Sequence, residues 1–333
     1  MRAGTNAGVA TLMLVVIAVV WLGVFPSCGS APSQDAGDGG AAKAAAPAAA
    51  ARPDFPPASS FGGFDAQRAY AHVEKTVALG PHPPGSEANR LAGDYIRGEL
   101  QSYGCAVEED NFEASTARGP IRMRNVVGKS PGASDKVVLL LSHYDTKILD
   151  TGEDFVGAND PGSSIGVVLE LARNLCGQKR ALTYWFGFVD GEESFGEWSD
   201  TNGTFGSRQM AAKLSLSGEL KKVKAVILAD LVGHFDPVYE RESNSTKWLK
   251  DMVWNTAKRL GYEKHFVAAE SPVEDDHLPF LKREVPAVDI IGFNSYPHWH
   301  QPSDTLDKIS PRSLALVGHV ILETLPALEK RFR

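Results

Sequence analysis

The sequence predicts a single α/β domain whose central sheet is mixed but mostly parallel, with helices on both faces. A continuous apolar run over residues 137–141 is typical of a strand buried on both faces, and the mainly apolar segments 182–189 and 223–228 are predicted to be further strands. Segments predicted as helices alternate with these runs, as expected of repeated βαβ units. The β-rich segment before them predicts antiparallel strands at one edge of the sheet.

The individual elements follow from periodicity and from turn residues. Helices are expected over residues 65–79, 86–103, 163–175, 205–214, 248–260 and 311–328, and strands over 106–113, 121–128, 137–141, 182–189, 223–228 and 285–291. The segment 80–85 contains three prolines and is expected to be a loop, because proline blocks helix continuation. Ser86 is expected to cap the helix that follows it.

The composition excludes several classes of protein. Of the 333 residues, 43% are hydrophobic, which is enough for a buried core and excludes a wholly disordered chain. Three cysteines cannot build a disulfide scaffold. The net charge of −7 argues against nucleic acid as a partner, because binding phosphates requires a basic surface.

Residues 1–28 are predicted to be a signal peptide or an anchor. An uncharged apolar run over residues 8–25 is just long enough to cross a bilayer. It leads into Ser27-Cys28, which resembles the end of a degenerate lipoprotein signal with Cys28 as the lipidated residue. An ordinary signal peptide and a retained membrane anchor through residues 8–25 are the alternatives. All three place the rest of the chain outside the cytoplasm, in the periplasm or at the cell surface.

The apolar segment is followed by a predicted disordered linker over residues 29–60. It consists mainly of Ala, Gly, Pro, Ser and Asp, so it has little to bury. No internal repeat is visible in the sequence. The catalytic domain is therefore expected over residues 61–333, with membrane contact only through the N-terminal anchor.

Acidic or imidazole side chains follow four of the apolar strands, near the point where each strand ends. They are His143, Glu193, Asp230 and His300, and Asp160 opens the helix between the first two. In open parallel sheets ligands bind beyond the carboxyl ends of the strands, so we expect these residues to meet in one crevice. Each residue alone has an ordinary explanation as a cap or a solvated side chain. Together they predict a zinc site, because a catalytic zinc takes three such ligands and leaves one position open.

Glu192 immediately precedes Glu193, and neighbouring residues in an extended chain point in different directions. One carboxylate can therefore bind a metal while the other faces the reacting group as a general acid and base. Burial beside such a site is expected to raise the pKa of the second carboxyl, which suits proton transfer near neutral pH.

The order of these residues resembles the zinc-dependent aminopeptidase fold family, and most closely its glutaminyl-peptide cyclotransferase (glutaminyl cyclase) branch. The matching segments together extend over residues 139–310. They are LLLSHYDTK at 139–147, FVGANDPGSSIGVVLELAR at 155–173, FVDGEESFGEWSDTNGTFGSRQMAAKL at 188–214, ILADLVG at 227–233, DDHLPFLKREVPAV at 275–288 and YPHWH at 296–300.

The resemblance implies a role for each residue at a matching position. It implies one zinc ion bound by Asp160, Glu193 and His300, with Glu192 as the proton shuttle. The remaining residues are implied to contact the substrate, and they are the acids Asp230 and Asp275 and the aromatic walls Trp198, Trp299 and Tyr296. The implied reaction cyclises an N-terminal Gln of peptides or proteins to pyroglutamate and releases ammonia.

The alternative is a zinc aminopeptidase that hydrolyses the first peptide bond, with Glu192 activating a water molecule. His143 and Asp230 match the ligands of a second metal in such enzymes, so the residues alone leave one zinc or two open. A non-enzymatic binding protein on the same fold is disfavoured, because it would not need both Glu192 and Glu193.

Two positions depart from the animal cyclases, and two cysteines could form a pair. The resemblance implies a cis peptide bond before Pro161, where the animal enzymes have Ser, and proline makes the cis form less costly. Asp289 replaces a His of their hydrogen-bond network, which puts that relay in doubt. Cys105 and Cys176 either pair or are small buried residues, and we favour the latter.

Overall fold

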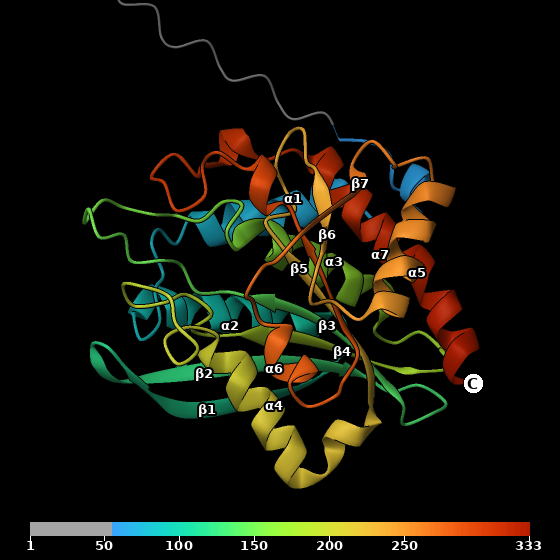
Figure 1. Cartoon of the computed structure of the whole chain (residues 1–333), viewed down its shortest axis with the longest axis horizontal. Coiled ribbons are helices and arrows are strands. Elements are labelled where there is room, and N and C mark those ends of the chain that lie inside the picture. The colour runs from blue at the N-terminus through green and yellow to red at the C-terminus, as the bar shows by residue number, and fades with distance from the viewer. Residues whose placement is uncertain (1–54) are drawn as a thin grey trace, which may run out of the picture. The chain divides into compact units, whose positions relative to one another are not determined.

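A six-stranded sheet, in the order β1-β2-β4-β3-β5-β8, runs through the middle of the domain (Figure 1). The structure is a computed structural model that describes residues 55–333. The strands are β1 (Ala106–Thr116), β2 (Gly119–Ser130), β3 (Val137–His143), β4 (Thr183–Val189), β5 (Val223–Asp230) and β8 (Ala287–Ile291). The strands β4, β3, β5 and β8 are parallel to one another, whereas β2 is antiparallel to both β1 and β4. The predicted sheet, with its antiparallel edge, is confirmed.

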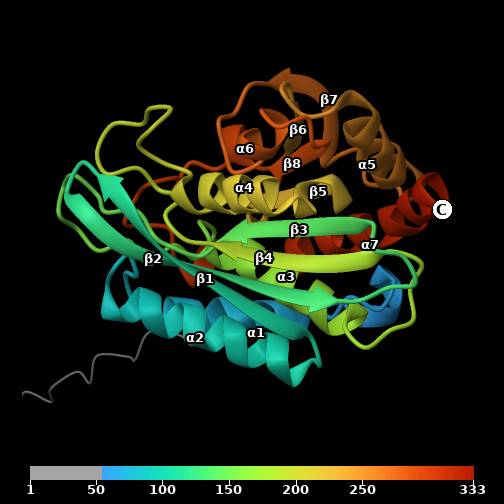
Figure 2. The same ribbon diagram turned by 90° about the horizontal axis from the view of Figure 1, so that it is seen from below.

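Helices cover both faces of this sheet, as predicted (Figure 2). The α-helices are α1 (Ala66–Val77), α2 (Glu87–Ser102), α3 (Gly162–Leu175), α4 (Phe205–Ser217), α5 (Lys247–Arg259), α6 (Leu278–Leu281) and α7 (Pro311–Phe332). Short 3₁₀ helices are η1 (Ala58–Phe61), η2 (Glu219–Lys222), η3 (Phe293–Ser295) and η4 (Leu306–Lys308). Ser86 caps α2 as expected, because its hydroxyl accepts a hydrogen bond from the Asn89 N–H at 3.0 Å.

The pleat of the strands divides the apolar residues between two cores. In β3, Val138 and Leu140 belong to the larger core, which includes residues of α1, α2, α3, α5 and α7. Leu139 and Leu141 belong to the smaller core with α4 and α6. Because successive side chains point to opposite faces, a strand with helices on both sides must be apolar throughout. This explains the continuous apolar runs in the sequence.

Two strands that the sequence did not predict form a separate parallel pair between β5 and β8 in the chain. They are β6 (Tyr239–Glu242) and β7 (Phe266–Ser271). Both are short and partly exposed, so neither contains a buried apolar run. The last predicted strand begins two residues late, at Ala287.

Cys105 and Cys176 form a disulfide, with their Cα atoms 5.3 Å apart. The expectation that they are unpaired was therefore wrong. Both side chains are buried, as expected, but they are 71 positions apart in the sequence. The bond depends on the end of α2 lying beside the end of α3, and periodicity within each helix does not predict that packing.

Replacing both cysteines by serine is expected to lower the free energy of unfolding by about 4 kcal/mol, the value for a closed loop of this length. The cross-link restricts the unfolded chain, so its removal restores conformational entropy to that state. Urea denaturation of the wild-type and double-variant proteins at one pH measures the difference. Reduced wild type provides the control and should behave like the variant, and an unchanged midpoint would contradict the prediction.

Within residues 55–333, no helix is long and apolar enough to cross a membrane. The predicted signal or anchor and most of the predicted linker, residues 1–54, lie outside the described residues.

Candidate active site

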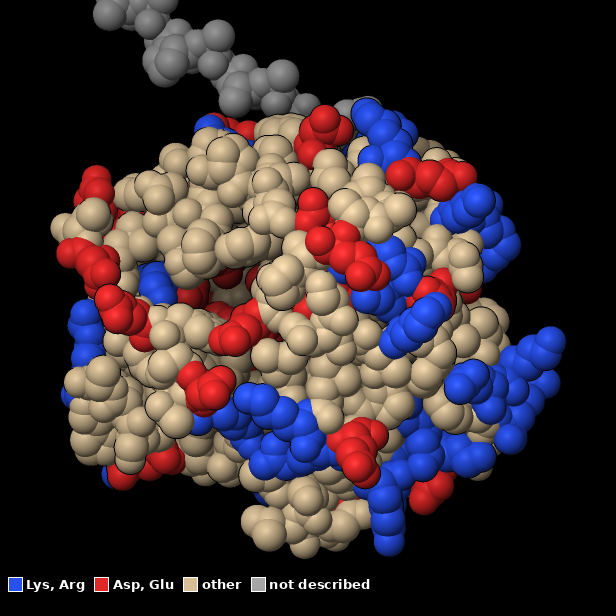
Figure 3. Space-filling model, viewed as in Figure 1, with Lys and Arg blue, Asp and Glu red and all other residues tan. Residues whose placement is uncertain are grey.

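The carboxyl ends of the parallel strands surround a pocket of about 430 Å³. It opens on the face seen in Figure 3, where acidic side chains lie in and around a hollow. The residues that line it come from segments far apart in the sequence, and they are Lys147, Asp160, Glu192, Glu193, Ser194, Gly196, Trp198, Asp230, Leu231, Pro272, Val273, Glu274, Asp275, Ile291, Phe293, Trp299 and His300. All the predicted site residues line this pocket except His143 and Tyr296.

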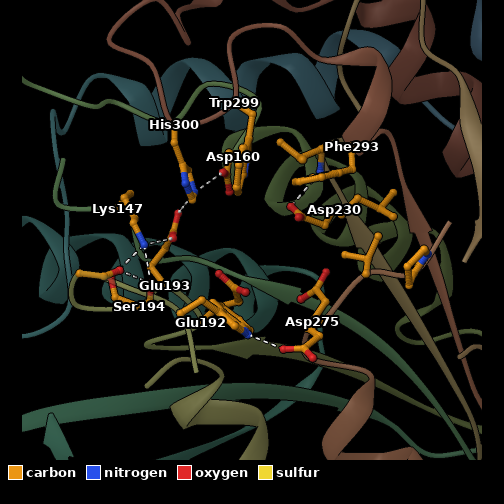
Figure 4. Close-up of a pocket in the computed structure, with 17 residues that line it drawn as sticks. Lys147, Asp160, Glu192, Glu193, Ser194, Asp230, Asp275, Phe293, Trp299 and His300 are labelled. Atoms are coloured by element: carbon orange, nitrogen blue, oxygen red, sulfur yellow. Dashed lines mark hydrogen bonds and ion pairs between the residues drawn. The ribbon is translucent and has the colours of Figure 1, made fainter. Parts of the chain in front are cut away.

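Asp160, Glu193 and His300 meet at one side of the pocket (Figure 4). The Nε2 atom of His300 lies 3.1 Å from Glu193 Oε1 and 3.4 Å from Asp160 Oδ2. The three donor atoms all lie within 4.8 Å of one another. His300 has a positive φ of 50°, which is rare for a residue with a side chain and is often found at functional sites.

His143, Asp160 and Asp230 form a second group of the same kind, so Asp160 belongs to both groups. Nε2 of His143 lies 3.1 Å from Asp160 Oδ1 and 3.4 Å from Asp230 Oδ1. This nitrogen is buried and has no hydrogen-bond partner among the described residues. A buried, unsatisfied ring nitrogen beside two carboxylates has the chemistry of a metal ligand.

Glu192 and Glu193 are held through their backbone by Asp145. This buried carboxylate accepts hydrogen bonds from the Glu192 N–H at 3.0 Å and the Glu193 N–H at 3.1 Å, one on each oxygen. The glutamate side chains then diverge, as expected, so that Glu193 reaches His300 while Glu192 points into the pocket beside it (Figure 4).

The pocket is rich in buried carboxyl groups, and this affects their protonation. Burial is the largest cause that raises the pKa of Glu192 and of Asp275 well above the ordinary values, and the charges of neighbouring acids add to it. Burial also raises the pKa of Asp230, together with the nearby Asp160 charge. For His300, burial alone would lower the pKa, but Glu193 and Asp160 raise it to about 10. The site therefore favours an added positive charge.

Aromatic rings form the walls of the pocket. The indole N–H of Trp198 donates a hydrogen bond to Glu274 Oε2 at 2.7 Å. The Trp299 ring stacks on His300, with centroids 4.0 Å apart and planes 24° apart. Phe293 packs edge-on against Trp299 at 4.6 Å. A hydrogen bond thus holds the Trp198 wall in place, and ring packing holds the Trp299 wall in place.

Tyr296 is not part of these walls, so its assignment as a wall residue is contradicted by the structure. Its side chain is buried outside the pocket, and its hydroxyl donates a hydrogen bond to Asp304. Phe293, three positions earlier, lines the pocket instead. The short helix η3 begins at Phe293 and ends just before Tyr296, and no motif indicated this turn.

Sequence reasoning also missed Lys147 and Asp304. The Lys147 ammonium lies 3.5 Å from Glu193 Oε2 and donates to the Ser194 carbonyl at 3.0 Å and hydroxyl at 2.6 Å. Its position at the end of the segment SHYDTK was the available signal. Asp304 lies behind the pocket, beside the backbone of Asp160.

Two further expectations concern the backbone and the core behind the pocket. The Asp160–Pro161 bond is cis, as predicted. Asp289 is buried, and neither of its carboxylate oxygens has a hydrogen-bond partner in the described part of the chain. His277 Nδ1 lies 3.8 Å from Asp289, while its Nε2 pairs with Glu242 at 3.0 Å.

Comparison with known proteins identifies a matching family. The model of the family described as "Peptidase family M28" matches residues 125–325, more than half of the chain. The chain belongs to peptidase family M28. Its membership confirms the resemblance that the motifs indicated.

Several proteins similar to this member of family M28 are named as cyclases. The chain is 29% identical over 289 residues to the glutaminyl-peptide cyclotransferase-like protein of Mus musculus, covering 78% of this chain and 75% of that protein. Its sequence is 37% identical to that of Acidobacteriales bacterium glutaminyl cyclase. The crystal structure of that protein matches with a TM-score of 0.76, covering 80% of this chain and 96% of the other. A Zn-dependent exopeptidase from Parabacteroides distasonis is also similar, with 28% identity and a TM-score of 0.72 over 78% and 97%.

A divalent metal ion fits the residues that this family M28 chain brings together. Zinc bonds to nitrogen and oxygen of about 2.0–2.2 Å place neighbouring ligand atoms roughly 3–4 Å apart. The separations of 3.1 and 3.4 Å around His300 Nε2 fall in this range. The excess of buried carboxylates supplies the negative charge that such an ion would balance.

Proposed function

We propose that this protein is a zinc-dependent glutaminyl-peptide cyclotransferase. It would convert the N-terminal Gln of peptides or proteins to pyroglutamate and release ammonia. The observation that carries the proposal is the carboxyl group of Glu192, which lines a pocket walled by Trp198 and Trp299 beside the Asp160–Glu193–His300 group without belonging to that group. The similarity to enzymes named as glutaminyl cyclases supports it.

The reaction forms a bond between the α-amine and the γ-carbonyl carbon of Gln, and breaks the bond to the side-chain nitrogen. Bound by Asp160, Glu193 and His300, zinc would supply Lewis acidity toward the γ-carbonyl oxygen. Glu192 accepts a proton from the attacking amine and donates it to the departing nitrogen, which leaves as ammonia. A carboxyl with a raised pKa is suited to both steps.

The other pocket residues bind and orient the substrate. Asp230 and Asp275 provide carboxylates for the substrate amine. Trp198 and Trp299 enclose the short Gln side chain and favour the folded conformer in which amine and carbonyl meet. Such orientation contributes several kcal/mol to lowering a barrier. The Glu274 carboxylate fixes Trp198 in this arrangement.

The second candidate is an aminopeptidase with two metal ions. The specific observation in its favour is the group His143–Asp160–Asp230, which shares Asp160 with the first group. Asp230 would then bind metal instead of the substrate amine. The similarity to a Zn-dependent exopeptidase is consistent with this alternative.

The two functions are distinguished by paired assays on the purified protein. Gln-naphthylamide is tested with a coupled aminopeptidase specific for pyroglutamate, and Leu-naphthylamide is tested alone. We expect a signal from Gln only when the coupling enzyme is present, and none from Leu. Direct release from Leu would disprove the cyclase. Elemental analysis should find one zinc per chain for the cyclase, whereas two would favour the peptidase.

We further propose that the protein is exported, to the periplasm or the cell surface, and acts there on peptide or protein N-termini. The disulfide between Cys105 and Cys176 supports this, because disulfides persist mainly in oxidising compartments.

A further inference from the structure

Asp304 connects two loops that carry candidate metal ligands. It follows His300 by four positions and is completely buried. Its Oδ1 accepts a hydrogen bond from the Asn159 N–H at 2.8 Å, and its Oδ2 accepts one from the Asp160 N–H at 3.1 Å. Its main-chain carbonyl accepts a third, from Ala158 N–H at 3.3 Å. Three successive amides of the Asp160 loop thus bind to one residue of the His300 loop.

This arrangement repeats the one made by Asp145. Each of these two buried carboxylates receives two consecutive backbone N–H groups, one on each oxygen. Asp145 fixes the backbone of Glu193, and Asp304 fixes that of Asp160. Buried backbone donors need acceptors, and a carboxylate satisfies two of them at once. An asparagine at position 304 would present one acceptor and one competing donor.

Each of the two loops also contains an unusual backbone conformation close to its ligand. The turn before Asp160 requires glycine at Gly157, where φ is 61° and an added Cβ would lie 2.1 Å from the Asp160 carbonyl oxygen. His300 itself has a positive φ, a conformation that persists only when the surroundings hold it. Tyr296 donates its hydroxyl hydrogen bond to Asp304 Oδ1 and so fixes the carboxylate from the other side.

We propose that Asp304, held by Tyr296, is a positioning residue that sets the separation of Asp160 and His300 and thereby the affinity of the site for zinc. The inference rests on the proposed function only in taking zinc as the bound ion. It assigns Tyr296 a structural task in place of the substrate contact that the sequence suggested.

The test is the affinity of the full-length protein for Zn²⁺, measured by competition with a chromophoric chelator and without substrate. Asp304→Asn is expected to lower this affinity 10- to 100-fold, which is the usual effect of removing a residue that orients a metal ligand by hydrogen bonding. Tyr296→Phe, which keeps both amide contacts, is expected to cause a smaller loss. In the Asp304→Asn variant, kcat measured at saturating zinc should return toward the wild-type value.

Glu170→Gln is the matched control. Glu170 is also a completely buried acid that accepts a backbone N–H, from Asp65 at 2.9 Å, but it lies on α3 outside the pocket. The Glu170→Gln variant should have a lower melting temperature than the wild type and an unchanged zinc affinity. Wild-type zinc affinity in folded Asp304→Asn, or an equal loss in Glu170→Gln, would overturn the inference. A lower affinity together with no cyclisation of Gln by the wild type would disprove the proposed function and leave this inference intact.

Discussion

Glu192→Gln is expected to reduce turnover of N-terminal Gln strongly while leaving metal binding unchanged. Glu192 lines the pocket, but it belongs to neither of the two groups of candidate ligands. Glutamine has the same shape and can hydrogen-bond, but it cannot accept and return a proton. General acid–base catalysis contributes about 100- to 10,000-fold, so kcat/KM should fall by this amount.

The measurement combines the coupled Gln assay with a zinc determination on the same sample. Glu197→Gln is the matched control, because Glu197 is an exposed carboxylate in the same loop and does not line the pocket. The Glu197→Gln variant should retain activity. If Glu192→Gln keeps wild-type kcat/KM, Glu192 is not the proton shuttle. If Glu192→Gln loses zinc together with activity, the Glu192 carboxylate contributes to metal binding instead.

His300→Ala is expected to remove the metal, and activity with it. The imidazole supplies one of three donors in the group with Asp160 and Glu193. The loss of a direct ligand should lower the zinc affinity by more than the 10- to 100-fold expected for Asp304→Asn, in which only a positioning residue is changed. Elemental analysis after dialysis should therefore find the variant free of the ion that the wild type retains.

His298→Ala provides the control for this experiment. His298 lies two positions earlier in the same loop, and its Nδ1 pairs with the Ser303 hydroxyl at 2.8 Å, away from the carboxylate group. This variant should keep its zinc. Retained zinc in His300→Ala would exclude His300 from the coordination sphere.

Much of the fold follows from local sequence, because a strand covered on both faces must be apolar throughout. β3, β4 and β5 were therefore predictable, and so was the meeting of His143, Glu193 and Asp230 at their carboxyl ends. β6 and β7 lacked this pattern, since each is partly exposed. Their pairing depends on contacts between distant segments.

The candidate site shows the same division. Residues next to strand ends were found from the sequence, because topology brings strand ends together. Other features depend on how loops fold over the pocket. Loop folding decides that Phe293 lines the pocket instead of Tyr296, and it also decides the positions of Lys147 and Asp304. The disulfide likewise required knowing that two helix ends are neighbours. Loop conformation and helix packing are long-range properties that motif spacing does not contain.

Asp160 belongs to both ligand groups, and this bears on how the chemistry of such proteins can diverge. A shared carboxylate allows one scaffold to accommodate either one ion or a pair. Ring closure and hydrolysis then differ in the origin of the attacking group, which is the substrate's own nitrogen in one case and solvent in the other. Few substitutions around a common centre would therefore separate a transferase from a hydrolase, with the architecture inherited unchanged.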